Sequence, residues 1–171
     1  MIAKNVQDLV QLLAKEPRKK VVFASGSFDL FHYDHLRYIE DAKKQGEILV
    51  VLVKSNKAVR LKGTDRPVID EEQRIAIVDA IRFVDYTMLV DYDENTEIHV
   101  EYDNESQYQW LKMFESVVDK VRPHIWMHED SLVLHNARMR LFEKYGVQSI
   151  PRGRGKTTST TQIVAKLTEN P

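Results

Sequence analysis

The feature that most constrains the fold of this chain is the segment at residues 21–35, VVFASGSFDLFHYDH. It reads as an apolar strand, a glycine turn and a helix start that carries His32 and His35. Histidines three residues apart share one face of a helix, so both rings would point the same way. Because a helix N-terminus attracts anions, this segment predicts an anion site, most naturally one for phosphate.

The rest of the chain alternates between strand-like and helix-like segments, which predicts an α/β fold. Strand-like apolar segments occupy 20–24, 48–53, 86–90, 124–127 and 147–150. Helical spacing of apolar residues predicts helices over 6–13, 35–45, 70–81, 108–121, 132–145 and 159–167. With no repeat and no linker, we expect one domain over 1–171. Ligands of such sheets bind where the winding direction reverses, and the loop at 25–34 should lie there.

Composition excludes several classes of protein. The chain has no cysteine, so disulfides, thiolate nucleophiles and cysteine-bound metals are excluded. No apolar run is long enough to span a bilayer and the N-terminus lacks the apolar core of a signal peptide, which favours the cytoplasm. A net charge of −1 predicts no general attraction to nucleic acid or membranes. Charge is nevertheless uneven, with an acidic insertion at about 91–107 and basic residues at 152–156. The acidic stretch is most simply a solvated loop, although its part at 99–107 could be a dimer arm or a lid.

Several motifs together resemble one enzyme superfamily. Residues 26–35 (GSFDLFHYDH) are similar to G-x-F-D-x-x-H-x-G-H, and residues 158–163 (TSTTQI) to I-S-T-T-x-I, the two signatures of the cytidylyltransferase-like nucleotidyltransferases. Residues 60–68 (RLKGTDRPV) resemble a run of the heptose 1-phosphate adenylyltransferases, which serve lipopolysaccharide-core sugar activation. The Pro151-Arg152 pair is shared with glycerol-3-phosphate cytidylyltransferases. Motifs in the right order over 21–166 are more specific than any one alone.

The resemblance implies a Rossmann-like three-layer α/β/α fold with a mostly parallel five-stranded sheet. It also implies a one-step reaction, in which an acceptor phosphate oxygen attacks the α-phosphorus of a nucleoside triphosphate and pyrophosphate leaves. Catalysis then reduces to alignment and charge stabilisation. Mg²⁺ would be carried on the triphosphate, with no metal site of the protein's own. The implied partners are ATP or CTP and a phosphorylated small molecule, a sugar 1-phosphate being favoured, in a homodimer.

The resemblance also assigns roles to individual residues. His32 and His35 would hold the phosphates and donate to the transition state, and Lys62 would neutralise their charge. Arg74 would grip a phosphate as a planar fork. The residues implied to bind the nucleotide and its phosphates are Ser25, Gly26, Ser27, Phe28, Arg74, Ser159, Thr160 and Thr161. The candidates for binding the acceptor are Asp29, Asp130 and Arg152.

The chain departs from the family pattern at two places. Asp34 stands where the family has glycine, and its charge would weaken phosphate binding unless a cation or donor offsets it. It could instead turn away at the start of the helix. Residues 127–131 (MHEDS) replace a Gly-Gly-Asp or Gly-Asp-Asp turn that relatives use for substrate contact, leaving Asp130 as the counterpart.

Four alternatives stay open at the level of sequence. The acceptor could be glycerol phosphate or another polyol phosphate with CTP, or the protein could be an archaeal-type FAD synthetase. Asp34 could make it a nucleotide-binding module that has lost catalysis. A metal-dependent hydrolase would use His32 and His35, with Asp29 or Asp34, to hold a zinc-like ion.

Overall fold

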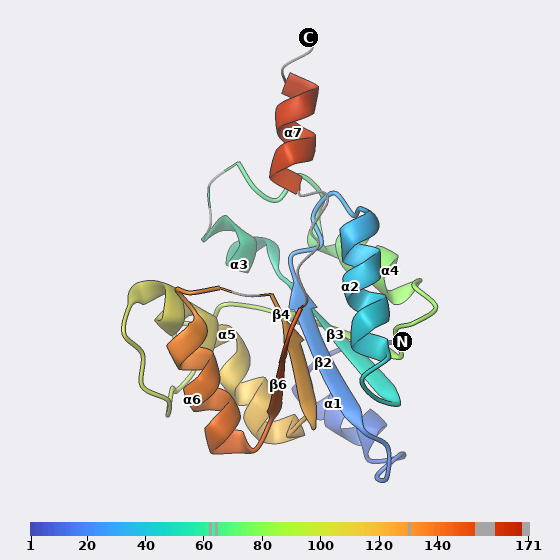
Figure 1. Cartoon of the computed structure of the whole chain (residues 1–171), viewed down its shortest axis with the longest axis vertical. Coiled ribbons are helices and arrows are strands. Elements are labelled where there is room, and N and C mark those ends of the chain that lie inside the picture. Colours follow the sequence, from blue (N-terminus) through green and yellow to red (C-terminus); the bar gives the residue numbers. More distant parts are fainter. Residues whose placement is uncertain (62, 64, 130, 153–159, 169–171) are drawn as a thin grey trace.

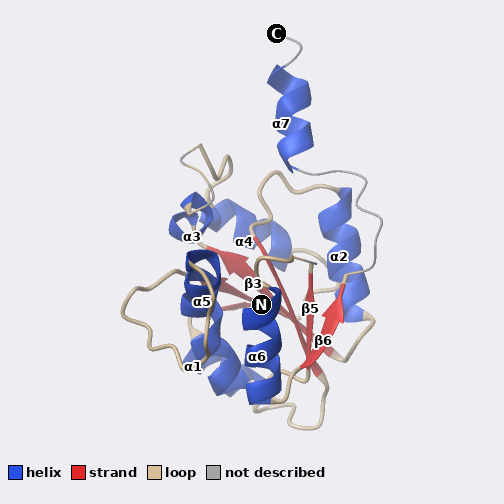
Figure 2. Ribbon diagram, turned by 60° about the vertical axis from the view of Figure 1, so that its left-hand side comes forward, coloured by secondary structure: helices blue, strands red, loops and turns tan. Residues whose placement is uncertain are grey.

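The computed structural model of this chain describes residues 1–61, 63, 65–129, 131–152 and 160–168. Within these ranges, strands and helices alternate along the chain and the strands lie side by side in one sheet (Figure 1). Helices cover both faces of this sheet (Figure 2). The predicted three-layer α/β/α architecture is therefore confirmed.

In the part of the chain that the structure describes, the sheet has six parallel strands in the order β1-β4-β3-β2-β5-β6. The strands are β1 (Ile2–Ala3), β2 (Val21–Gly26), β3 (Ile48–Lys54), β4 (Tyr86–Val90), β5 (Ile125–His128) and β6 (Gln148–Pro151). Five of them match the predicted strands. The additional strand, β1, has two residues and pairs with β4 at the sheet edge. Two residues are too few to form a recognisable alternating pattern, so the prediction of five strands was one short.

The helices are α1 (Val6–Leu13), α2 (Tyr33–Lys43), α3 (Asn56–Arg60), α4 (Glu71–Asp79), α5 (Glu105–Val121), α6 (His135–Tyr145) and α7 (Thr160–Thr168). All but α3 correspond to predicted helices. The short helix α3 comes soon after β3 and is capped by Ser55, whose side chain accepts a hydrogen bond from the Ala58 amide. No helix within the described ranges is long and apolar enough to cross a membrane.

The strand β2 lies at the centre of the sheet and is buried on both faces. Phe23 belongs to the apolar cluster beneath α1, α5 and α6, whereas Val22 and Ala24 belong to the cluster beneath α2 and α4. Successive side chains of a strand point to opposite faces, so a continuous apolar run is what a two-sided position requires. This explains why residues 21–24 of β2 carry no polar side chain.

The winding direction of the sheet reverses at β2. From β2 the chain proceeds to β3 and β4 on one side, and β5 and β6 lie on the other. Ligands of open α/β sheets bind at the carboxyl ends of the strands next to such a reversal. The loop between β2 and α2 leaves the sheet at this point, as the sequence predicts (Figure 1).

The acidic segment after β4 packs against α5 and α6. Lys112 of α5 donates to the carbonyl oxygens of Glu94 and Thr96, at 2.5 and 2.6 Å. Arg140 of α6 forms an ion pair of 2.9 Å with Asp103. The basic side chains of α5 and α6 therefore hold the acidic segment against the helical layer that these two helices form.

Candidate active site

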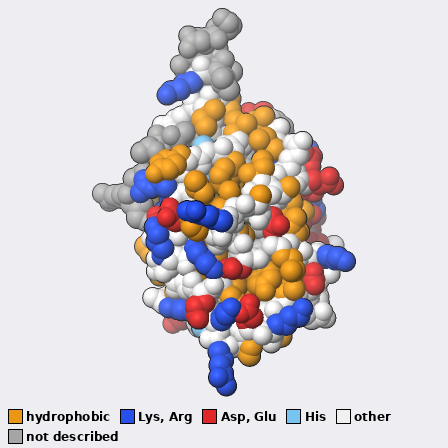
Figure 3. All heavy atoms as spheres, turned by 90° about the vertical axis from the view of Figure 1, so that its right-hand side faces the viewer, with side chains coloured by type: hydrophobic (Ala, Val, Ile, Leu, Met, Phe, Trp, Pro, Cys, Tyr) orange, Lys and Arg blue, Asp and Glu red, His pale blue; other side chains and the backbone are white. Residues whose placement is uncertain are grey.

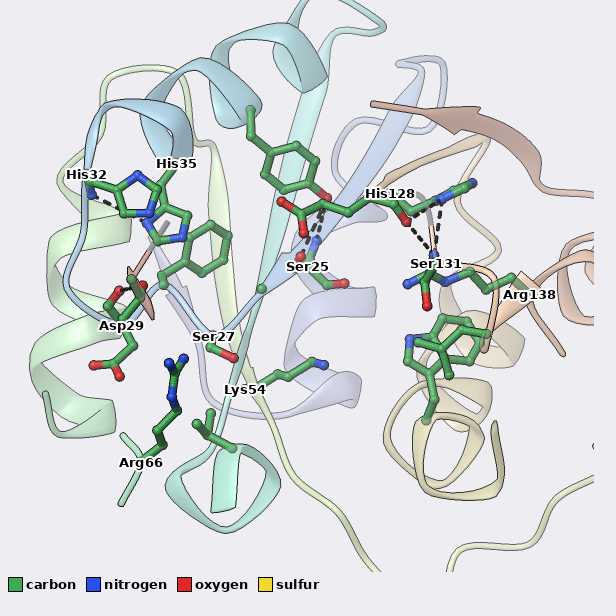
Figure 4. Close-up of a pocket in the computed structure, with 18 residues that line it drawn as sticks. Ser25, Ser27, Asp29, His32, His35, Lys54, Arg66, His128, Ser131 and Arg138 are labelled. Carbon is green, nitrogen blue, oxygen red and sulfur yellow. Dashed lines mark hydrogen bonds between the residues drawn. The ribbon is translucent and has the colours of Figure 1, made fainter. Parts of the chain in front are cut away.

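A cavity of about 390 Å³ lies at the carboxyl ends of β2, β3 and β5 (Figure 4). The cavity is lined by Thr160 from the second signature and by most of the residues predicted at and next to the first. The latter are Ser25, Gly26, Ser27, Phe28, Asp29, His32 and His35. Its wall is completed by Tyr38, Lys54, Val59, Arg66, Trp110, His128, Glu129, Ser131, Leu134 and Arg138. The fold thus brings the two signatures to one cavity at the reversal of the sheet.

The loop between β2 and α2 has an unusual backbone. Phe28 and Leu30 both adopt positive φ angles, 52° and 45°, a region that non-glycine residues rarely enter. Such conformations persist only where the surrounding structure enforces them, and they occur often at functional sites. Gly26 leaves room for this turn, because a Cβ atom there would lie 3.0 Å from the Phe28 ring. Glycine at position 26 therefore avoids a tight contact with the Phe28 ring.

The two histidines stack on each other at the start of α2. Their ring centroids are 3.8 Å apart and their planes differ by 23°. The amide of His32 donates to Nδ1 of His35 at 3.4 Å, so the neutral His35 ring carries its proton on Nε2. The buried Phe28 ring meets His35 edge-on at 5.4 Å. The His32 amide and the rings of His32, Phe28 and Phe31 therefore contribute to the orientation of His35.

Asp29 joins three segments of the chain. Its carboxylate accepts hydrogen bonds from the amides of Val68 and Ile69, at 3.0 to 3.1 Å. Its backbone carbonyl accepts a hydrogen bond of 2.7 Å from the Thr160 hydroxyl at the start of α7. This residue was expected to bind the acceptor. In the structure its carboxylate holds the end of the 60–68 run against the β2–α2 loop.

Asp34 lies behind the cavity, outside its wall. The side chain is fully buried, and Arg152 forms an ion pair with it at 3.7 Å while donating to its backbone carbonyl at 2.7 Å. A second carboxylate, Glu129, lies 3.1 Å from the same guanidinium. The negative charge of Asp34, at the position where the family has glycine, thus lies beside the positive charge of Arg152. Arg152, expected at the acceptor, likewise does not line the cavity.

Arg74 is fully buried on α4 and lies outside the cavity wall. Its guanidinium donates to the carbonyl oxygens of Ile69, Ser27 and Lys54, at 2.9, 2.5 and 2.7 Å, and to Oδ1 of Asn56 at 2.8 Å. Burial lowers the pKa of Arg74 from its usual range, and the carboxylate of Asp29 opposes this shift. The Arg74 guanidinium, which was expected to bind a phosphate, thus binds backbone carbonyl oxygens at the ends of β2 and β3.

Tyr38 of α2 connects the strands on either side of the reversal. Its hydroxyl donates to the Met127 carbonyl at 2.7 Å and accepts from the Ser25 amide at 3.2 Å. Burial raises the pKa of Tyr38 well above its usual value, so the hydroxyl stays neutral. This side chain therefore braces the floor of the cavity between β2 and β5.

Sequence reasoning missed Lys54, His128 and Arg138, which also line the cavity. Lys54 ends the apolar strand β3, and that position was a usable signal because a charge interrupts an apolar run there. Arg138 lies within α6 and His128 ends β5, where local sequence gave no indication of a shared site. Trp110 was assigned to the core, and it both packs in the core and lines the cavity.

Some predicted site residues lie outside the described ranges. These are Lys62, Asp130 and Ser159. Thr161 follows Thr160 in α7.

Within the described part of the chain, no group of three histidine, aspartate or glutamate side chains is arranged to hold a metal ion. The carboxylates proposed as partners of His32 and His35 are directed elsewhere: Asp29 to backbone amides and Asp34 to Arg152.

Comparison with protein families agrees with the geometry. A family model described as cytidylyltransferase-like matches residues 23–166. The bifunctional protein HldE of Campylobacter jejuni (strain RM1221) is 43% identical over 96 residues, which cover 56% of this chain and 21% of that protein. The HldE protein of Citrifermentans bemidjiense is 42% identical over 100 residues, 57% of this chain and 20% of that protein. The matched region thus spans about a fifth of the length of these curated relatives.

Solved structures share the architecture. The lipopolysaccharide core biosynthesis protein from Thermoplasma volcanium GSS1 has a TM-score of 0.61 at 23% identity, covering 81% of this chain and 99% of that one. The pantoate-beta-alanine ligase from Francisella tularensis has a TM-score of 0.66 at 15% identity, covering 99% of this chain and 78% of that one. At such identities the likeness establishes the fold alone.

Proposed function

Because the chain belongs to the cytidylyltransferase-like family of nucleotidyltransferases, we propose that it transfers a nucleoside monophosphate from ATP or CTP to a phosphorylated small molecule. The observation that carries this proposal is the stacked pair of His32 and His35 at the start of α2, in a cavity that Thr160 of the second signature also lines. A helix start and two imidazoles are the groups that a triphosphate needs around its reacting phosphorus.

The proposed reaction needs positioning more than chemistry from the protein. An acceptor phosphate oxygen forms a bond to the α-phosphorus. The bond from that phosphorus to the oxygen shared with the β-phosphorus breaks, and pyrophosphate leaves with that oxygen. Ring N–H groups of His32 and His35 donate to the oxygens on which negative charge grows. The strained turn at Phe28 keeps the His35 ring in place, so little reorganisation accompanies the transfer.

We propose a sugar 1-phosphate of the heptose type as the acceptor and ATP as the donor. The support is the similarity of residues 60–68 to the heptose 1-phosphate adenylyltransferases, together with the identity of 42–43% to the HldE proteins. A role in lipopolysaccharide-core sugar activation, in the cytoplasm and as a homodimer, would follow from the same resemblance. Glycerol or polyol phosphate with CTP, and FAD synthesis, are the alternative reactions within the family.

Mg²⁺ is proposed to enter with the triphosphate. In the described cavity wall, the carboxylate of Asp29 binds backbone amides and that of Glu129 binds Arg152. This supports a Mg²⁺ ion that is held by the triphosphate. When bound, the ion would neutralise phosphate charge. The side chains of the cavity would then bind the phosphate oxygens that Mg²⁺ does not bind. Arg66 is a further cation in the cavity wall.

The experiment that tests this function measures pyrophosphate release. The protein is incubated with each nucleoside triphosphate, Mg²⁺ and a panel containing heptose 1-phosphate, glucose 1-phosphate, glycerol 3-phosphate and flavin mononucleotide. We expect pyrophosphate in stoichiometric amounts with a nucleotidylated product, identified by mass spectrometry, for at least one pair. Nucleotide binding without turnover across the whole panel would favour the module that has lost catalysis.

Replacing Asp34 by glycine, the residue of the family, is expected to change kcat by less than about threefold, because the carboxylate lies outside the cavity wall and beside Arg152. The same change should lower the free energy of unfolding by about 1–3 kcal/mol, since Arg152 loses a buried partner. Chemical denaturation and steady-state kinetics measure the two effects. Asp34→Asn is the control that removes the charge without adding glycine flexibility. A rise in kcat of tenfold or more in Asp34→Gly would show instead that this aspartate suppresses catalysis.

A further inference from the structure

Arg152 follows directly after β6, and other elements almost enclose its side chain. Only 11% of this side chain is exposed. By contrast, basic and acidic side chains lie mixed on the outer surface of the side that α2 and α4 cover (Figure 3). The backbone amide of Arg152 donates to the His128 carbonyl at 2.7 Å, which continues the pairing of β5 with β6. A guanidinium inside the molecule needs acceptors around it, because burying a charge without them is costly. The elements that supply these acceptors are therefore the ones that Arg152 connects.

The guanidinium connects the start of α2 to the end of β5. Nη2 donates to the backbone carbonyl of Asp34, in the first turn of α2, at 2.7 Å, and lies 3.7 Å from the carboxylate of the same residue. Nη1 donates to the carboxylate of Glu129, which follows β5, at 3.1 Å. A planar fork that binds acceptors on two elements fixes their relative position, which the single nitrogen of a lysine does less well.

Tyr38 extends this connection to β2. The guanidinium carbon of Arg152 lies 5.4 Å from the centre of the Tyr38 ring, within the range of a cation–π contact. The hydroxyl of Tyr38 in turn joins the Ser25 amide of β2 to the Met127 carbonyl of β5. Arg152 and Tyr38 together therefore tie α2 to the ends of β2, β5 and β6.

The next residue after Asp34 is His35, so a displacement of the Asp34 carbonyl moves the backbone from which the His35 ring extends. Arg152 itself lies outside the described cavity wall, whereas His35 lines it. Arg152 can therefore affect a reaction in the cavity only through other residues. Nucleotidyl transfer depends on alignment, and a misplacement of about 1 Å can lower a rate about 100-fold. The contact with position 34 is made through the backbone, so Asp34→Gly retains it and a substitution of Arg152 removes it.

We propose that Arg152 is a positioning residue for His35: it holds the first turn of α2 against the ends of β5 and β6, and thereby aligns the His35 ring in the cavity. The effect on the reaction rests on the proposed function, in which His35 donates to the phosphates. Arg152 thus has a role other than the acceptor binding that the resemblance implies.

An NMR experiment tests this alignment without relying on turnover. The full chain is labelled with ¹⁵N at its histidines, and the ring nitrogens are recorded at an alkaline pH at which imidazole is neutral. His35→Ala identifies the signals of His35. In the unaltered protein we expect the Nε2–H form, since the His32 amide donates to Nδ1. In Arg152→Gln the two nitrogen shifts of His35 should move toward each other, because both tautomers become populated. Unchanged shifts in this variant would overturn the proposal.

Arg37→Gln is the matched control for the NMR experiment. Arg37 lies on the same helix, and its guanidinium carbon is 6.0 Å from the centre of the exposed Tyr33 ring. This variant should leave the His35 signals unchanged, and an equal change in it would also overturn the proposal. Arg152→Lys is the second variant, for use if Arg152→Gln does not fold. It keeps a positive charge beside Asp34 but loses the planar fork, so the His35 signals should move in the same direction.

A kinetic double-mutant cycle separates positioning of His35 from a general structural role. We expect Arg152→Gln to lower kcat about tenfold or more in single-turnover measurements at saturating nucleotide. In the His35→Ala background the same substitution should lower kcat less than about twofold, because the ring that Arg152 aligns is absent. An equal loss in both backgrounds, or no loss in either, would refute the positioning role. If no acceptor is turned over while the His35 signals move as expected, the proposed function alone is refuted.

Discussion

Replacing either His32 or His35 by alanine is expected to lower kcat at least about 100-fold, because each ring donates where negative charge grows in the transition state. The stack at 3.8 Å couples the two rings, so removal of one also frees the orientation of the other. The loss should therefore be similar in both variants, and the double variant should be little worse than either. Single-turnover measurements of pyrophosphate release, at saturating nucleotide, record the effect on the chemical step.

The control for this prediction is His99→Ala. His99 is an exposed histidine on the acidic segment, 59% exposed in its side chain, and its contact with Glu97 is a weak surface pair at 3.8 Å. This variant should retain the kcat of the unaltered protein. Circular dichroism should show that all three variants fold alike. Rates close to normal in both His32→Ala and His35→Ala would refute the proposed mechanism.

Replacing Arg74 by lysine is expected to lower the free energy of unfolding by about 2–4 kcal/mol, since lysine has three donors on one nitrogen and cannot reproduce a planar fork. The guanidinium spans three carbonyl oxygens and one amide oxygen, and buried acceptors left without a donor are costly. Urea denaturation followed by fluorescence measures this loss.

The same substitution separates a bracing role from direct phosphate binding. Two of the acceptors are the carbonyls of Ser27 and Lys54, so Arg74 supports the cavity from behind. Arg82→Lys, at an exposed position beside Phe83, should leave stability within about 0.5 kcal/mol of normal and serves as the control. If Arg74→Lys kept its stability but weakened nucleotide binding tenfold, direct phosphate contact would be the better explanation.

The parts of the fold that were predicted correctly depend on short-range patterns. The apolar run of β2, the glycine turn after it and the acids that open α4 are each legible within a few residues. Gly146 ends α6 with a φ of 68°, a left-handed conformation that glycine adopts without strain. These signals do not require knowledge of distant neighbours, which is why the order of the elements and the position of the candidate site could be read from the chain.

The parts that could not be predicted are contacts between distant segments. Asp34 meets Arg152 across 118 positions of sequence, and Arg74 reaches the end of β2 across 47. The neighbouring sequence does not distinguish an arginine that will be buried against backbone carbonyl oxygens from one that will bind a phosphate. The meeting of Lys54, His128 and Arg138 in one cavity has the same origin, because β3, β5 and α6 come together there only through the winding of the sheet.

By itself, the amino-acid sequence determined the alternation of strands and helices, the turn at Gly26 and the pair of histidines at the start of α2, because periodicity, turn chemistry and helix geometry act over a few residues. Only the tertiary structure decided which charges lie in the cavity. It placed Asp34 and Arg152 together behind the wall, assigned Arg74 to the backbone, and brought Lys54 and Arg138 inside. Burial and pairing of charges depend on every element packed around them, and that packing exists only once the sheet has formed.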